Sequence, residues 1–281
     1  MTEPNNQAKN QANNQDYILG TERTELLRLG LQHQVWAQEA RRGWKTAGFR
    51  PGQTLLDLGC GPGFCTQDMA YIAGEQGKVI AVDMSPSFIQ FATAVNQIHA
   101  LNIDYRETSF DDMELEDESL DGAFCRWALA WVPNPGEVLA KVAKALKPGA
   151  SFVVHEYYDW RTLQTEPHWP ELDHSIAMAL KSFKDSEAEI DVGRHLPEMI
   201  ESQGLELAGV RPMSKLVRPE TLGWNWPASF FEVYFPKLVA NGLLEASTCS
   251  TALQQWKQLT NTPGATCQCP QMVEVIARKP S

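Results

Sequence analysis

Two hydrophobic periods alternate along the first half of the chain. Short runs that are apolar on both faces, such as 54–59 and 78–84, are separated by longer segments whose apolar residues recur at helical spacing. Runs of the first kind are typical of parallel strands buried between helices. The pattern therefore predicts a doubly wound α/β fold with a mostly parallel seven-stranded sheet and right-handed crossovers.

The same pattern divides the chain into a core and insertions. An Asn- and Gln-rich lead has nothing to bury and is expected to be disordered, and Thr21 is expected to cap the first helix. After Tyr158 the alternation stops, and two helical insertions are expected to cover the carboxyl edge of the sheet, where ligands bind in open α/β folds. The predicted segments are a lead (1–15), an N-terminal helical segment (16–48), an α/β core (49–158), a cap insertion (159–192), a core helix and strand (193–219), a second helical cap insertion (220–265) and a final strand (266–281).

Composition narrows the function classes. The chain has 24 basic and 35 acidic residues, a net charge of −11, and no Lys/Arg cluster, which argues against nucleic acid and anionic membranes as partners. No apolar run reaches the roughly 20 residues of a membrane span, so we expect a cytoplasmic protein with a small-molecule partner. The C-x-C pair Cys267 and Cys269 lacks the second pair of a usual zinc site, and no metal is expected. The oligomeric state is left open.

The stretch LLDLGCGPGFCTQD, residues 55–68, carries three alternating glycines directly after a predicted strand. Gly59, Gly61 and Gly63 allow a sharp bend and a close approach to a ligand; a simple strand-to-helix turn is the alternative. Phe64 stands where the dinucleotide fingerprint has its third glycine. Asp57 beside the loop would repel a pyrophosphate and attract a cationic ligand.

A second acid follows at the end of the next strand. Asp83 lies 24 residues beyond Gly59, where a carboxylate can accept both hydroxyls of a ribose. The implied ligand has an unphosphorylated ribose and a cationic part. S-adenosylmethionine meets both conditions, whereas a dehydrogenase or a non-catalytic nucleotide-binding protein is the alternative.

Four motifs follow one another along the chain: LLDLGCGPG, VIAVDMS, DESLDGAFCRWALAWVPNP and ALKPGASFVVHE. In this order they resemble class I S-adenosylmethionine-dependent methyltransferases, most of all the small-molecule group that includes the ubiquinone and menaquinone enzymes. The resemblance is strong over residues 50–157 and implies a Rossmann-like methyltransferase fold with S-adenosylmethionine as cofactor. The cofactor-binding residues that it implies are Tyr17, Asp57, Gly59, Gly61, Gly63, Asp83, Met84, Ser109, Phe110, Arg126 and Trp127.

The adenine-edge motif departs from the family pattern, and the role of Arg126 has two interpretations. The adenine-edge motif usually reads G-D-A, with the acid accepting from the exocyclic amine, but this chain has Thr108, Ser109 and Phe110. Ser109 is expected to accept from the amine, with Asp111 or Asp112 as the alternative, and the Phe110 backbone N–H is expected to bind the ring nitrogen. Arg126 emerges from a buried strand, where an unpaired Arg is costly. It either binds the carboxylate of the cofactor or neutralises an acid such as Asp57.

Methyl transfer from a sulfonium is an in-line displacement that mainly needs alignment and exclusion of water. His155 is a candidate base or a core histidine, and Glu156, on the opposite face of the strand, and Tyr17 are further catalytic candidates. The expected reaction is methylation of an oxygen or nitrogen of a small aromatic or amine-bearing metabolite, with carbon methylation of quinone- or polyketide-like compounds as an alternative. Residues expected to contact the acceptor, or else to pack the cap, are Trp131, Tyr157, Tyr158, His168, Trp224, Trp226 and Phe230.

Overall fold

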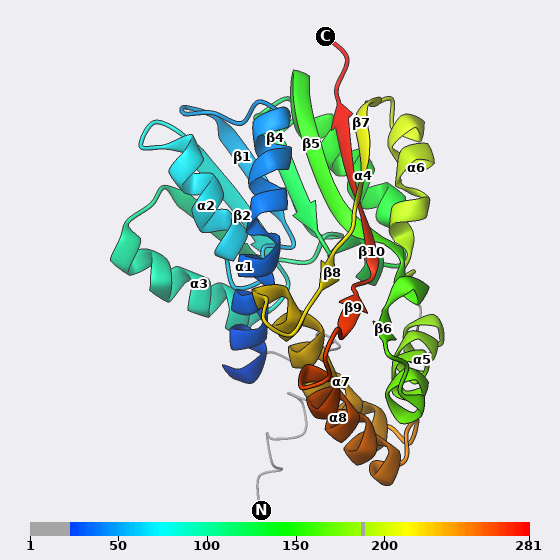
Figure 1. The fold of residues 1–281 in the computed structure, drawn as a ribbon. Helices are drawn as coiled ribbons and strands as arrows, with labels where there is room; N and C mark the ends of the chain where they lie inside the picture. The colour runs from blue at the N-terminus through cyan, green and yellow to red at the C-terminus, as the bar shows by residue number, and fades with distance from the viewer. Residues whose placement is uncertain (1–22, 187–188) are drawn as a thin grey trace, which may run out of the picture.

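A seven-stranded sheet forms the centre of the computed structural model, which describes residues 23–186 and 189–281. Its strand order is β3-β2-β1-β4-β5-β10-β7, and β10 is the strand that runs antiparallel to its neighbours (Figure 1). The predicted doubly wound, mostly parallel sheet is confirmed. Its strands are β1 (Thr54–Leu58), β2 (Lys78–Asp83), β3 (Ile103–Glu107), β4 (Leu120–Arg126), β5 (Leu146–Asp159), β7 (Glu206–Met213) and β10 (Gln271–Arg278).

Helices cover both faces of this sheet, because successive strand residues point to opposite sides. Leu55 packs with residues of the first helices on one face, whereas Leu56 and Leu58 pack with residues of later helices on the other. Ser85 caps the third helix by accepting a hydrogen bond from the Phe88 N–H, as the Ser-Pro pair predicts. The helices are α1 (Arg23–Thr46), α2 (Phe64–Ala73) and α3 (Pro86–His99) on the first face, and α4 (Pro135–Ala145) and α6 (Leu196–Ser202) on the second.

The predicted helical cap lies beyond the carboxyl ends of β1, β4 and β5 (Figure 1). It consists of α5 (Pro170–Lys184), α7 (Asn225–Ala240) and α8 (Ala246–Thr260), which share a separate, strongly aromatic hydrophobic cluster. The predicted Thr21 cap and the disordered lead lie outside the described residues. Short 3₁₀ turns lie between these elements: η1 (Leu129–Trp131) before α4, η2 (Trp160–Thr162) after β5, η3 (Val192–Arg194) before α6 and η4 (Leu222–Trp224) before α7.

The pattern did not predict a second, three-stranded sheet in the order β6-β9-β8 beneath the cap. Its strands are β6 (Gln164–Glu166), β8 (Leu216–Val217) and β9 (Thr266–Gln268), which are too short to show a period of two. Cys267 lies in β9, Cys269 directly after it, and both are buried. Within the part of the chain that the structure describes, no group of three or more His, Cys, Asp or Glu side chains is arranged to hold a metal ion.

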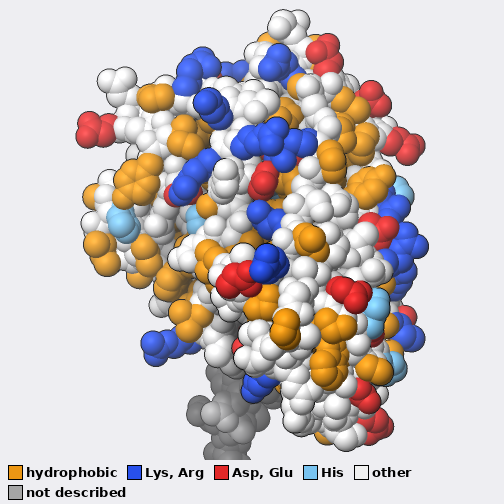
Figure 2. Space-filling model, in the orientation of Figure 1, with side chains coloured by type: hydrophobic (Ala, Val, Ile, Leu, Met, Phe, Trp, Pro, Cys, Tyr) orange, Lys and Arg blue, Asp and Glu red, His pale blue; other side chains and the backbone are white. Residues whose placement is uncertain are grey.

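Charged side chains are mixed with other types on the face shown in Figure 2, where lysines and arginines are interspersed with acidic and hydrophobic side chains. Among residues 23–186 and 189–281, none of the helices combines the length and the apolar character that crossing a bilayer requires.

Candidate functional site

The glycine loop joins β1 to α2 in a left-handed backbone conformation. Gly59, Gly61 and Gly63 have φ angles of +72°, +52° and +82°, a region that residues with a Cβ rarely adopt. A Cβ on Gly59 would lie 2.4 Å from the Ala128 Cβ, whereas one on Gly61 would meet no atom within 4 Å. The loop is therefore packed tightly against the residue after β4 at Gly59 and open to a ligand at Gly61.

Asp83, at the end of β2, holds the loop in place. One carboxylate oxygen accepts a hydrogen bond from the Gly61 N–H at 2.8 Å and the other from the Ser85 N–H at 2.9 Å. Burial raises the pKa of Asp83, although both hydrogen bonds favour the charged form. Each oxygen keeps a further lone pair for a ligand hydroxyl, and the neighbouring Met84 is 53% exposed, as a side chain that receives a flat ring would be.

Asp57 is buried beneath the loop and accepts a hydrogen bond from the Thr66 hydroxyl at 2.6 Å. Burial raises its pKa to about 6, against the opposing effects of that hydrogen bond and of the positive charge of Arg126. The two side chains form no ion pair within 4.0 Å, although the structure describes both. Arg126 thus acts on Asp57 through space.

Arg126 turns instead toward α1. Its Nη2 lies 3.4 Å from the His33 Nδ1, and its guanidinium carbon lies 4.9 Å from the centre of the Trp127 ring. Its Nη1 is buried and has no hydrogen-bond partner among the described residues. A buried donor of this kind is costly unless a ligand satisfies it.

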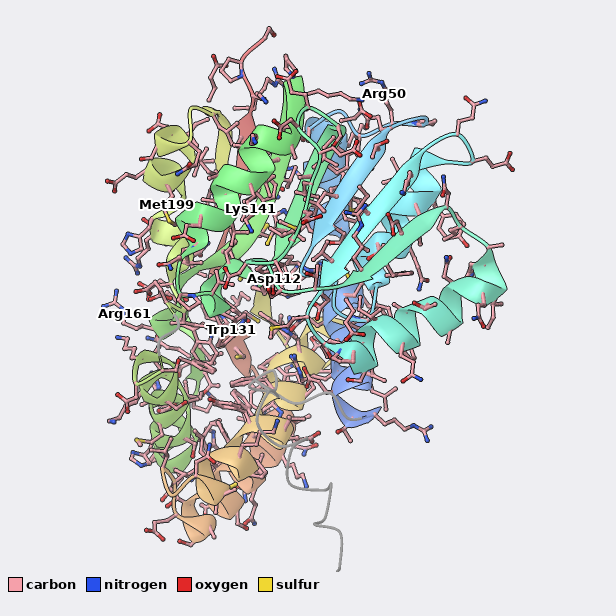
Figure 3. The ribbon with its side chains drawn as sticks, turned by 180° about the vertical axis from the view of Figure 1, so that it is seen from behind. Arg50, Asp112, Trp131, Lys141, Arg161 and Met199 are labelled. Carbon is pink, nitrogen blue, oxygen red and sulfur yellow. The ribbon has the colours of Figure 1, made fainter. Side chains whose placement is uncertain are left out.

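The segment after β3 reaches the same loop. The Phe110 ring comes within 3.5 Å of the point where a Cβ of Gly59 would stand. Ser109 donates its hydroxyl hydrogen to the Asp112 carboxylate at 2.8 Å and accepts from the Asp112 N–H. Lys141 of α4 binds the carbonyl oxygens of Phe110 and Asp111 (Figure 3 labels Lys141 and Asp112). Ser109 is thus engaged in a turn beside the loop, and Phe110 is the residue of this motif that contacts it.

An aromatic pocket begins at Trp127, the residue after Arg126. Trp127 has a φ angle of +55°, and its ring stacks on Tyr157 and on Trp226, each with ring centres 5.8 Å apart. Figure 3 shows another wall residue, Trp131, where the sheet meets the cap. The structure thus brings together four of the seven predicted acceptor residues. The pocket is lined by Arg28, Gln32, Trp127, Trp131, Tyr157, Trp160, Leu163, Phe183, Ile190, Trp226, Pro227, Phe230 and Pro270.

Sequence reasoning missed the contribution of α1 to this pocket. Arg28 donates to the buried Glu25 carboxylate and to the Gln32 side-chain oxygen, which also accepts from the Trp226 Nε1 at 2.9 Å. Together with Trp36 these α1 residues recur at helical spacing and are all buried. The spacing of these polar residues on the same helical face as Trp36 was the sequence signal that could have indicated their burial.

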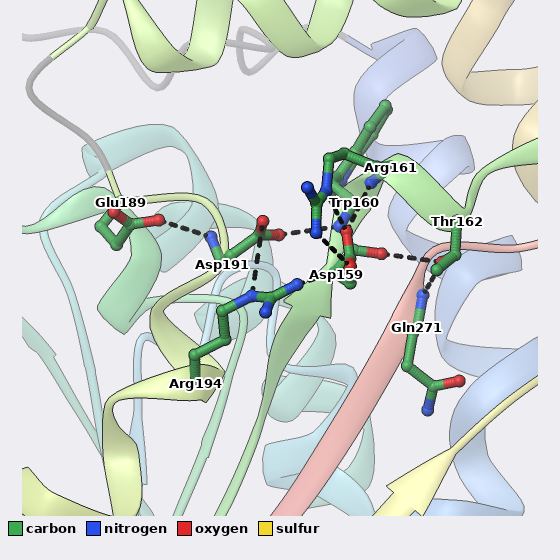
Figure 4. A network of polar contacts seen from close by, with 8 residues as sticks. All are labelled: Asp159, Trp160, Arg161, Thr162, Glu189, Asp191, Arg194 and Gln271. Atoms are coloured by element: carbon green, nitrogen blue, oxygen red, sulfur yellow. Dashed lines mark hydrogen bonds and ion pairs between the residues drawn. The ribbon is translucent and has the colours of Figure 1, made fainter.

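The Trp160 wall of the pocket is held by a polar network at the end of β5 (Figure 4). The Asp191 carboxylate accepts from the Trp160 N–H at 2.8 Å, and Arg194 pairs with Asp159. Hydrogen bonds from Arg161 are the largest influence on Asp159 and lower its pKa to about 2. The network therefore links β5 and η3 around the residue that carries the pocket wall.

Three of the predicted acceptor residues do not line this pocket. Trp224 is buried against Trp256 of α8, with ring centres 4.2 Å apart. Tyr158 is 42% exposed and stacks under Arg194. The His168 side chain is 64% exposed and pairs with Asp173 at the start of α5. All three stabilise the cap or its surface and do not line the pocket.

His155 is a fully buried residue of the core, in agreement with the second of the two roles that the sequence left open for it. Its side chain is fully buried under α1, and its Nε2 lies 2.9 Å from the Glu274 carboxylate of β10. Burial lowers the pKa of His155, which keeps the ring neutral. A Cβ added to Gly43 of α1 would lie 2.6 Å from Glu274 and 3.3 Å from His155. The pair therefore sits at the interface between α1 and the sheet, away from the acceptor pocket.

This interface predicts an acid-sensitive fold. Burial alone would raise the pKa of Glu274, but hydrogen bonds from His155 and Arg211 lower it to about 2. A depressed carboxyl pKa contributes stability above the ordinary value near 4.5, and this contribution is lost as the pH falls from there to about 2. We expect Glu274→Gln to lower the free energy of unfolding at pH 7 by about 2 kcal/mol. Below pH 5, the free energy of unfolding of this variant should decrease less steeply with pH than that of the parent. Urea titrations across pH check this, with the exposed Glu232→Gln as control; an unchanged acid limb in Glu274→Gln would contradict it.

Glu156 points to the opposite side of β5 and is also fully buried. Its carboxylate accepts the Leu129 N–H at 2.8 Å, and burial raises its pKa to about 8. It is not a lining residue of the pocket. The structure therefore places Glu156 as the residue that holds the η1 backbone next to Trp127. Tyr17, the third catalytic candidate, lies outside the described residues.

The open sheet with its topological switch at β1 and β4, the glycine loop and the acid at the end of β2 define a nucleoside-binding α/β protein of the methyltransferase type. A model of the methyltransferase-domain family matches residues 49–204. This segment is more than half of the chain, and the chain belongs to that family.

Individual relatives agree with this assignment. The ubiquinone biosynthesis O-methyltransferase of Hahella chejuensis is 35% identical over 101 residues, which are 36% of this chain and 41% of the relative. The ubiquinone/menaquinone biosynthesis C-methyltransferase of Brucella suis is 24% identical over 214 residues, which are 72% of this chain and 79% of that protein. The first curated relatives are matched over only 41% to 48% of their own length.

A solved structure shares the fold. Phosphoethanolamine N-methyltransferase 2 of Haemonchus contortus, bound to S-adenosylhomocysteine, has a TM-score of 0.59 at 15% identity, covering 94% of this chain and 60% of that one.

Methyltransferases of this family take their methyl group from S-adenosylmethionine, and the residues of this site fit it. Asp83 has lone pairs for the ribose, Met84 is exposed beside it, and Gly61 faces open space. The unpartnered Nη1 of Arg126 suits a carboxylate.

Proposed function

We propose that this protein transfers a methyl group from S-adenosylmethionine to an oxygen or nitrogen of a small aromatic metabolite. The observation that carries the proposal is the position of Trp127. It stands between Arg126 and Ala128, the residue that packs against Gly59, and its ring lines the aromatic pocket. The donor loop and the acceptor pocket therefore meet at one residue.

Positioning of the acceptor against the methyl group would supply most of the rate acceleration. Trp127 stacks on Tyr157 and on Trp226, so this side of the pocket is built from aromatic rings that an aromatic acceptor can contact. Holding a nucleophile about 3 Å from the methyl group and excluding water can supply several kcal/mol of the barrier. The donor is already activated by its positive sulfur, so alignment is the main task of the pocket.

The pocket lining also indicates which acceptor atoms fit. Its described residues include Arg28 and Gln32 but no Asp, Glu or His. The described lining residues therefore supply no carboxylate or imidazole base, which favours an atom that is already nucleophilic, such as a phenolate oxygen or a neutral amine.

A small molecule is also the partner that the charge of the chain supports. The net charge of −11 opposes binding to a polyphosphate backbone. Methylation of a carbon, as the name of the Brucella suis relative states for that protein, is the competing assignment.

The test is a methyl-transfer screen with the full chain. The purified protein is incubated with methyl-labelled S-adenosylmethionine and a small-molecule extract, and labelled products are identified by mass spectrometry. We expect a labelled O- or N-methyl aromatic product that is missing with Asp83→Ala. A C-methyl product would show that the acceptor atom is carbon and would contradict the proposed O- or N-methylation. Co-purified NAD(P) with no affinity for S-adenosylhomocysteine would refute the methyltransferase assignment.

A further inference from the structure

A histidine that the proposed reaction does not use lies beside the donor loop. His33 is on α1, directly after the pocket residue Gln32, and its side chain is mostly buried. Its ring stacks on Phe64, the first residue of α2, with ring centres 6.0 Å apart. His33 therefore bridges α1 and the start of the helix that follows the glycine loop.

The neighbours of His33 determine which ring nitrogen carries the proton. Nδ1 faces the Arg126 Nη2 at 3.4 Å and the Cys65 Sγ at 3.6 Å. A guanidinium can only donate, and burial raises the pKa of the Cys65 thiol to about 12, which keeps it a donor as well. Nδ1 must therefore accept, so the proton is on Nε2.

Nε2 in turn lies 3.4 Å from the Asp68 carboxylate of α2. Burial opposes the charge of Asp68, but its contacts with His33 and Arg41 lower its pKa below the ordinary value. Asp68 is thus ionised and favours the tautomer with its proton on Nε2. A continuous chain of contacts runs from the exposed Arg41 through Asp68 and His33 to Arg126.

We propose that His33, fixed by Asp68, positions the Arg126 guanidinium so that Nη1 receives the carboxylate of S-adenosylmethionine. The inference rests on the proposed function and adds His33 as a positioning residue. Arg126 lies near the buried Asp57 yet makes no ion pair with it, and the Nδ1 contact holds Nη2 on the α1 side. Nη1 then remains buried without a partner among the described residues, ready for an anionic oxygen.

The experiment compares two ligands that differ in one group: S-adenosylhomocysteine and its analogue without the carboxylate, 5′-(3-aminopropylthio)-5′-deoxyadenosine. Calorimetry measures the affinity of both for the full chain and for three variants. His33→Phe keeps the stacking on Phe64 and removes the acceptor, His33→Asn restores an acceptor near the Nδ1 position, and His99→Phe is the control at an exposed histidine of α3.

We expect His33→Phe to weaken S-adenosylhomocysteine about tenfold and the analogue less than twofold, because only the first ligand uses Arg126. His33→Asn should recover most of the loss, and His99→Phe should match the parent. Equal weakening of both ligands by His33→Phe would show a purely structural role and overturn the proposal. A parent that binds neither ligand would instead refute the proposed function, and this inference with it.

Discussion

Replacing Asp83 with alanine is expected to weaken binding of S-adenosylhomocysteine by about 100-fold or more. The Asp83 carboxylate would accept both ribose hydroxyls, and a hydrogen bond to a charged group contributes about 1.5 to 3 kcal/mol. The same carboxylate also holds the Gly61 N–H, so its removal loosens the open part of the glycine loop. The loss should therefore exceed that of the ribose contacts alone. Calorimetry with the purified variant measures it.

Asp104→Ala is the matched control for this experiment. Asp104 lies on the neighbouring strand β3, but its carboxylate pairs with Lys78 and Arg106 away from the loop. We expect cofactor affinity within about twofold of the parent, because no contact of Asp104 reaches the site. Thermal unfolding followed by circular dichroism should show both variants folded. If folded Asp83→Ala protein bound S-adenosylhomocysteine with unchanged affinity, Asp83 would not be a ribose-binding residue.

Replacing Trp127 with leucine is expected to lower kcat/KM for the acceptor about 100-fold while cofactor affinity changes little. Trp127 stacks on Tyr157 and Trp226 and stands in edge contact with Trp36. Without its ring the acceptor has no fixed plane, and a displacement of about 1 Å from the methyl group costs roughly 100-fold in rate. Steady-state kinetics with the acceptor found by labelling, together with calorimetry for the cofactor, separate the two effects.

Trp224→Leu supplies the comparison, because Trp224 is equally buried but packs on Trp256 outside the pocket. Both substitutions remove a large buried ring, and each should cost a few kcal/mol of stability. Only Trp127→Leu should change acceptor kinetics at a temperature where both proteins are folded. Equal kinetic losses in the two variants would mean that the loss reflects stability and that the acceptor binds elsewhere.

The donor half of the site was predictable because its signals are local. The glycines at 59, 61 and 63 and the acid at 83 follow apolar strands directly, and parallel strands bring their carboxyl ends to one edge. The backbone angles of the loop and the bonds of Asp83 agree with that expectation. Strand periodicity also separated His155 from Glu156 by face.

The acceptor half depended on contacts between distant segments. Periodicity could not show that α1 covers the His155 face, nor that Glu274 of β10 would meet that ring. Trp224 and Trp226 stand two residues apart, where η4 passes into α7, and they point to different partners. Composition marked the cap as aromatic, but only the tertiary arrangement separates pocket walls from internal packing.

The two ends of helix α1 serve different parts of the molecule. Its first turns contribute Arg28 and Gln32 to the acceptor pocket, and its last turns pack Ala40 and Trp44 against the sheet. Substitutions of Arg28 or Gln32 would therefore alter the proposed acceptor pocket without touching the sheet or Asp83. Most residues of the proposed acceptor pocket lie on other elements, so engineering a new acceptor would require changes in the cap as well as in the first turns of α1.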